Sequence, residues 1–215
     1  MYKKLIIILC MFLLTGCSTY SINKMEYNEV IDTIINESVK KPNINNKGYK
    51  YYLPTDFSVI KDNEHSQVLL SGKNKYYLNV DIVSYYYKND IKSDREFDDY
   101  SFYTFTHNDT SGYLKIRKNN DNFFVELCYN YAIIEVEVKE NELRSVISKS
   151  ITILNSIKYN ELVIKTYIED NNIEANETVY KIPEPEEKDD SKNILQYIEE
   201  EELAAEEAAN KESIE

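Results

Sequence analysis

Few cysteine or histidine side chains are present in this sequence to act as a thiol nucleophile, an imidazole base or a metal ligand. The chain has three cysteines and two histidines, and His65 and His107 lie among acidic or polar neighbours such as Glu64 and Asn108. A hydrolase needs a nucleophile, a base within hydrogen-bonding reach and donors for an oxyanion. No Gly-x-Ser-x-Gly, His-Glu-x-x-His, Walker or Gly-x-Gly-x-x-Gly motif supplies such a set. We therefore predict no catalytic, metal or cofactor residues.

One thiol–imidazole pair, Cys128 with His107, is still possible as a catalytic dyad. Strand alternation would place Cys128 beside Glu126, on the face opposite Leu127. A packed or half-exposed cysteine and two solvated loop histidines are the more common outcome for such residues. The sequence leans towards a protein that is not an enzyme, although a cryptic envelope hydrolase stays an alternative.

The overall charge is strongly acidic, with a formal net charge of −13 and a sequence pI of about 4.7. Nucleic-acid binding needs a basic patch, so we predict no nucleic-acid partner. After the first 17 residues Cys128 is the one cysteine left, which excludes a small disulfide-stapled domain. The abundance of Asn, Lys, Ile and Tyr indicates an AT-rich genome.

The first twenty residues have the pattern of a secretory signal. Lys3 and Lys4 precede an apolar run, Leu5 to Leu14, which is about half the length that a membrane-spanning helix needs. Leu14-Thr15-Gly16-Cys17 follows, and this motif resembles the lipobox of bacterial lipoproteins. The resemblance implies cleavage before Cys17, lipid on its thiol, and anchoring at the extracytoplasmic face of the cell membrane of a Gram-positive organism. An ordinary signal peptide with an incidental cysteine, or an uncleaved anchor, is the alternative.

Residues 17–47 are predicted to form a tether followed by a helix. From Met25 the apolar side chains recur at helical spacing, and Pro42 ends the pattern. These apolar side chains form a stripe along one face of the helix, and the stripe is expected to dock on the following domain rather than on a partner protein. It consists of Val30, Ile31, Ile34, Ile35 and Val39.

Residues 48–160 are predicted to form an α+β domain, an antiparallel meander with a packed C-terminal helix and an added N-terminal helix. Short strands alternate between apolar and polar residues up to Val138, and the pattern then changes to helical spacing over Glu140 to Leu154, with Asn141 as N-cap. Asn43 to Lys47 is expected to be a loop, and Asn89 to Asp99 a loop with a short helix. The longest predicted strand is Tyr76 to Tyr87.

In that strand Tyr77, Tyr85 and Tyr87 would share one face with Asp81. Exposed tyrosines are common at binding surfaces, because they give a large contact area at low entropic cost. The three tyrosines are therefore a possible binding surface. The alternative is that a helix, or the segment after Glu161, covers them.

The body also resembles the PsbP-like fold. The resemblance rests on Tyr51-Tyr52-Leu53-Pro54 with Phe57, a meander, and a helix running into Leu154-Asn155-Ser156-Ile157. It implies a small domain of a group that includes binding and assembly factors and shares no active site. The added N-terminal helix and the long tail depart from that pattern.

The last part of the chain divides into an extension, residues 161–183, and an acidic tail, residues 184–215. Leu162 to Ile168 fits either a strand or a helix, and the tail has thirteen acidic residues against three lysines. Such tails are usually solvated and mobile. Together these features predict a lipid-anchored binding or assembly module at the cell envelope with a protein or envelope partner. The alternatives are a cryptic envelope hydrolase and a small solute-binding lipoprotein.

Overall fold

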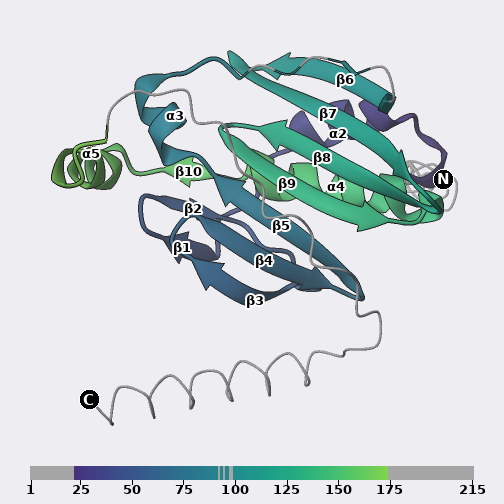
Figure 1. Ribbon diagram of the computed structural model, residues 1–215, viewed down its shortest axis with the longest axis horizontal. Coiled ribbons are helices and arrows are strands. Elements are labelled where there is room, and N and C mark those ends of the chain that lie inside the picture. Colours follow the sequence, from purple (N-terminus) through teal and green to yellow (C-terminus); the bar gives the residue numbers. More distant parts are fainter. Residues whose placement is uncertain (1–21, 92, 94, 97–98, 174–215) are drawn as a thin grey trace, which may run out of the picture.

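A seven-stranded antiparallel sheet in the order β3-β4-β5-β9-β8-β7-β6 forms the centre of the molecule in the computed structural model (Figure 1). The structure describes residues 22–173, apart from 92, 94, 97 and 98. Its strands are β3 (Ser58–Asn63), β4 (Ser66–Ser71), β5 (Asn74–Val80), β6 (Asp99–His107), β7 (Thr110–Asn119), β8 (Asn122–Tyr129) and β9 (Ala132–Val138).

Short hairpin turns set the register of this sheet. The turns between β6 and β7, β7 and β8, and β8 and β9 each contain an asparagine at positive φ: Asn108, Asn120 and Asn130. Asparagine tolerates this left-handed conformation, which matches the twist of paired strands. The predicted hairpin around Asn119 to Asn122 is confirmed, with Asn119 opposite Asn122.

One face of the sheet is covered by helices. α4 (Leu143–Asn155) follows a 3-10 turn, η2 (Glu140–Glu142), and lies against β8 and β9. Its N-cap is Glu142, so the prediction of Asn141 is wrong, because the 3-10 turn delays the helix start. The buried side chains of α4 and of the strands form one continuous core that includes Ile147, Leu127 and Ile134.

The N-terminal helix, α2 (Tyr27–Ile35), packs on α4 together with the 3-10 turn η1 (Ile22–Lys24). Val30, Ile31 and Ile35 are buried, which confirms that the apolar stripe docks on the domain, whereas Val39 lies beyond the helix and is exposed. The Arg144 Nε donates to the Met25 carbonyl oxygen at 2.6 Å and fixes the start of the helix. The helix ends well before Pro42, after Ile35.

A second, three-stranded sheet joins the two ends of the domain. Its strands are β1 (Ile44–Asn46), β2 (Tyr49–Tyr51) and β10 (Lys158–Tyr159), in the order β1-β2-β10. The loop expected from Asn43 to Lys47 is therefore wrong, because three of its residues form β1. The Tyr52 backbone N–H donates to the Ser156 Oγ at 2.8 Å, so the two short motifs that resemble the PsbP-like pattern lie side by side.

The predicted strand from Tyr76 to Tyr87 is wrong beyond Val80. Asp81 accepts a hydrogen bond from the Ser84 backbone N–H at 2.8 Å and caps a short helix, α3 (Ile82–Tyr87). That helix ends at Lys88, which has a left-handed conformation (φ 56°). The N-cap at Asp81 favours a helix here, and its effect is larger than the preference of the tyrosine-rich run for a strand. The short helix expected between Asn89 and Asp99 is absent from the described residues of that segment.

The segment after the small sheet is a helix, α5 (Glu161–Asp170), which contacts α3. The predicted α+β class is confirmed. No helix among the described residues is long and apolar enough to cross a membrane. The predicted signal, the lipidation site Cys17 and the acidic tail of residues 184–215 lie outside the described residues.

Candidate functional site on the polar face of the large sheet

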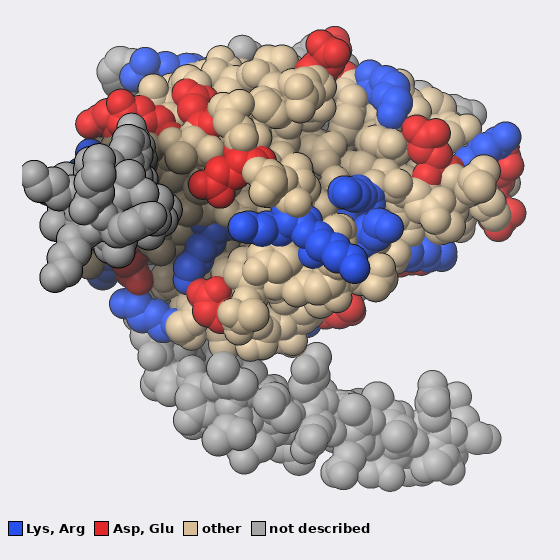
Figure 2. All heavy atoms as spheres, turned by 180° about the vertical axis from the view of Figure 1, so that it is seen from behind, with Lys and Arg blue, Asp and Glu red and all other residues tan. Residues whose placement is uncertain are grey.

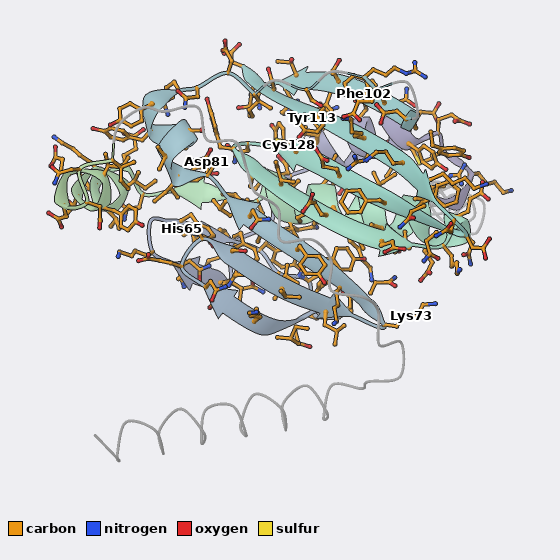
Figure 3. All side chains as sticks on the ribbon, in the orientation of Figure 1. His65, Lys73, Asp81, Phe102, Tyr113 and Cys128 are labelled. Carbon is orange, nitrogen blue, oxygen red and sulfur yellow. The ribbon has the colours of Figure 1, made fainter. Side chains whose placement is uncertain are left out.

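The face of the large sheet opposite α4 is rich in polar and aromatic side chains, and we call it the polar face. Strand alternation assigns it to the residues that point away from the apolar core. Figure 1 views this face, with α2 and α4 behind the sheet, and Figure 3 labels Tyr113 and Cys128 on neighbouring strands. Its central residues are Tyr77, Tyr113, Lys115, Arg117, Phe124, Glu126, Cys128 and Glu135.

Four of these side chains form a row across four strands. Tyr77 on β5 is opposite Glu135 on β9, Glu135 is opposite Glu126 on β8, and Glu126 is opposite Lys115 on β7. Directly opposed residues have Cβ atoms about 5 Å apart, so the two carboxylates are close neighbours. Like charges in this arrangement repel each other unless a donor or a proton lies nearby.

Glu126 has hydrogen-bonding and charged partners. The Tyr113 hydroxyl donates to its Oε1 at 2.6 Å, and an Arg117 Nη lies 3.7 Å from its Oε2. Lys115 is turned to the side, where its Nζ bonds to the Glu96 Oε1 at 2.6 Å. Glu126 is therefore partly neutralised by its neighbours on the sheet.

Glu135 is less well compensated, because Arg117 acts on it only through its charge. Only 2% of the Glu135 surface is exposed, and its Oε1 is buried without a hydrogen-bond partner. Burial, reinforced by the nearby Glu126 charge, raises the pKa of Glu135 to about 7. A buried carboxylate oxygen without a donor is costly, and a donor or a cation at the Glu135 Oε1 would be stabilising.

Cys128 also lies on this face, where it is 4% exposed and its thiol is free. Burial raises the pKa of the Cys128 thiol well above its ordinary value, which makes it a poor nucleophile. The register pairs Cys128 with Tyr113 and Tyr113 with Thr104, so His107, three positions further along β6, has the opposite orientation. The strand geometry thus excludes a Cys128–His107 pair.

His65 differs from its prediction as a solvated loop residue. It lies in the turn between β3 and β4, half-buried, with its ring 5.3 Å from that of Tyr167 and 6.4 Å from that of Tyr49. Both ring nitrogens are buried without hydrogen-bond partners. Burial lowers the pKa of His65, and the neutral ring acts as a packing element between α5 and β2.

The three predicted binding tyrosines are separated by the structure. Tyr77 lies on the polar face, whereas Tyr85 and Tyr87 belong to α3. The Tyr85 ring stacks on Tyr159 with centroids 3.8 Å apart, and its hydroxyl bonds to Glu161. The Tyr87 hydroxyl donates to the Ile173 carbonyl oxygen at 2.9 Å. Tyr85 and Tyr87 therefore hold the C-terminal segment in place and do not form one surface with Tyr77.

The side of the molecule covered by helices carries charges of both signs. In Figure 2 a short band of Lys and Arg side chains crosses the middle of this view, with Asp and Glu on either side. Across the part of the chain that the structure describes, no group of three His, Cys, Asp or Glu side chains is arranged to hold a metal ion.

Sequence reasoning missed the carboxylate pair. The alternation of Glu135 and Glu137 with Ile134, Val136 and Val138 is visible in the sequence and indicates only a strand. The signal that distinguishes Glu135 is its register opposite Glu126, which a single sequence does not fix. Comparisons with protein-family models, with curated proteins and with solved structures found no match.

Proposed function

We propose that this chain is a lipid-anchored, extracytoplasmic binding or assembly module of the cell envelope, and that it binds its partner across the polar face. The observation that carries the binding role is Glu135, whose Oε1 is buried without a hydrogen-bond partner and which lies opposite a second carboxylate, Glu126. Tyr77 and Tyr113 flank the pair on the neighbouring strands. The lipobox at Cys17 supports the anchor.

The chemistry of this face defines the partner. A lysine or arginine side chain would supply the missing donor to Glu135 and offset the charge of Glu126. Tyr77 and Tyr113 offer aromatic rings to the aliphatic part of such a side chain. The partner is thus a protein or envelope component that presents a basic side chain on an extended segment.

A photo-crosslinking amino acid at Tyr77 tests the binding role in intact cells of the native organism. We expect capture of a partner from position 77, and loss of that capture when Glu135→Gln removes the negative charge that pairs with the basic side chain of the partner. The same amino acid at Tyr100, which is exposed on the edge strand β6, is the matched control. Capture that is equal from both positions, or that is unchanged in Glu135→Gln, would refute the proposal.

The anchor is tested separately through Cys17→Ala. This change removes the acceptor of lipid and should leave unprocessed precursor that incorporates no labelled fatty acid. Normal maturation and membrane retention of the variant would contradict lipidation at Cys17. A Cys128→Ala variant should mature normally and is the control.

The carboxylate pair also favours one second candidate, an envelope hydrolase. Two neighbouring carboxyl groups are the usual acid and base of glycoside hydrolysis, and burial raises the pKa of one of the two here, Glu135. Incubation of the protein with purified envelope glycans decides this case. Release of reducing ends that Glu135→Gln abolishes would favour the hydrolase, and no release would leave the binding role.

A further inference from the structure

The helix α5 is held to the domain along one side only. Ile164 and Ile168 are its buried residues, and they lie one turn apart. Leu162 and Val163 are exposed on the other side. At Gly48, in the turn between β1 and β2, an added Cβ would lie 2.9 Å from the Ile164 Cγ1, so the helix packs directly against backbone there. A short helix of this kind is stable only through its packed side, and it can open without the large sheet.

The packed side of α5 covers a histidine. His65, labelled in Figure 3, lies in the turn between β3 and β4, and the Tyr167 ring of α5 meets its ring edge to face at 5.3 Å. Both ring nitrogens of His65 are buried without a hydrogen-bond partner. A neutral imidazole loses one donor and one acceptor to water in this position, whereas a protonated one would bury a second N–H and a positive charge. The docked helix therefore favours the neutral ring.

The charged groups around the imidazole only partly offset its burial. Burial has the largest effect on the pKa of the imidazole and lowers it, whereas the adjacent Glu64 and Asp81 at the N-cap of α3 act in the opposite direction. Lys47, in the turn between β1 and β2, lowers the pKa further and forms an ion pair with Glu64. From β2 and α5 the ring is faced by Tyr49 and Tyr167, and neither bonds to its nitrogens. A proton on the ring thus has no partner in the docked state.

The other attachments of α5 are weak. The helix starts after Asn160, which directly follows β10. At its first residue Glu161 accepts from the Tyr85 hydroxyl at 3.2 Å, and this bond is exposed. Beyond its end, the exposed bond from the Tyr87 hydroxyl to the Ile173 carbonyl oxygen is 2.9 Å long. Exposed hydrogen bonds exchange readily with water and add little stability, so the packed side decides whether α5 stays docked.

We propose that α5 is an acid-released latch, in which protonation of His65 expels Tyr167 and the helix swings out at Asn160 while both sheets stay folded. Release exposes the apolar side chains of Ile164 and Ile168. A histidine that is held neutral stabilises the docked helix fully above its ordinary pKa of about 6.5, and this contribution is lost as the pH falls below that value. The latch goes beyond the proposed function and does not depend on it.

Hydrogen exchange measured by mass spectrometry on the full chain in detergent tests the latch. Protection factors are compared between pH 7.5 and pH 5, because they correct for the chemical exchange rate at each pH. The protection of the α5 amides should fall by up to about thirtyfold, which is the limit for an open state whose histidine has the ordinary pKa of about 6.5. The amides of β8 and β9 should keep their protection, which distinguishes local release from global unfolding.

Two uncharged variants and one control assign the fall to His65. His65→Phe keeps a ring against Tyr167 but cannot be protonated, so α5 should stay protected at pH 5. His65→Leu repeats the test without a ring, and circular dichroism confirms that each variant is folded. His107→Gln removes the other histidine of the chain, at the end of β6, and should leave the fall unchanged.

Three results would overturn the latch. The first is equal protection of α5 at the two pH values in the wild type. The second is a fall that persists in a folded variant without the His65 imidazole. The third is a fall that β8 and β9 share to the same extent, because the whole domain would then be unfolding.

Discussion

Both faces of the large sheet bury side chains, but the buried side chains differ in chemistry. On the helix-covered face Leu114, Leu127 and Ile134 are fully buried against other apolar side chains. On the polar face the same strands bury a glutamate, a lysine and a thiol: Glu135, Lys115 and Cys128. Burial of apolar side chains stabilises the fold by itself, whereas a buried charge is destabilising unless an opposite charge or a hydrogen-bond partner lies beside it. The first face therefore accounts for stability, and the second is the place to look for function.

The largest expected effect is a loss of packing on the apolar face. Leu127→Ala should lower the free energy of unfolding by about 2–5 kcal/mol, because it leaves a cavity under α4. Cys128→Ala, one residue along on the polar face, removes a single sulfur atom and should cost about 1 kcal/mol. Urea unfolding of both variants measures the difference. Equal losses would show that the polar face is packed as a second core.

The next effect is the pH dependence that arises from Glu135. Its pKa is raised from 4.5 to about 7, so the folded state favours the protonated carboxyl. This contribution is fully present below pH 4.5 and is lost as the pH rises towards 7, by on the order of 3 kcal/mol. Glu135→Gln should abolish that loss and stabilise the protein at pH 7.5. Glu137→Gln, on the same strand and face, should leave it intact.

Unfolding by urea between pH 5 and pH 7.5 checks this prediction. Two charged groups act on Glu135, the Glu126 carboxylate and the Arg117 guanidinium, and both remain in the variant. His65 contributes in the opposite direction, because its lowered pKa makes stability rise with pH in part of the same range. Both proteins contain His65, so subtracting the free energy of unfolding of Glu135→Gln from that of the wild type at each pH removes the His65 contribution. An identical pH profile in the two proteins would contradict the burial of a charged Glu135.

The smallest effect compares two tyrosine hydroxyls on opposite faces. Tyr113→Phe removes the bond to Glu126 in a buried setting and should cost about 1 kcal/mol. Tyr103→Phe removes an exposed bond to Asp32 of α2 and should cost roughly half of that or less. Thermal unfolding of the two variants at one pH gives the comparison. A larger loss in Tyr103→Phe would mean that the α2 contact carries more of the stability than its exposure implies.

Much of the fold followed from local patterns in the sequence. The alternation in β8 and β9 and the helical spacing of Val146, Ile147 and Ile151 predicted the meander and the helix that covers it. The errors arose where a local cap competes with composition, as at Asp81, which starts a helix in the middle of a tyrosine-rich run. The candidate site was not predictable, because the Glu126–Glu135 pair depends on a register between strands. Tyr77 lies on the polar face of the sheet, as alternation in β5 indicated, whereas Tyr85 and Tyr87 lie in α3 and not on a strand.

The small sheet has a consequence for how the chain acquires its structure during synthesis. β2 pairs with β10, and Lys50 lies opposite Lys158. The edge of β2 that faces β10 therefore stays unpaired until residue 158 has been synthesised. Contacts between such distant positions slow folding, because a long loop must close before any hydrogen bond forms. The domain therefore remains incomplete until nearly all of it has emerged.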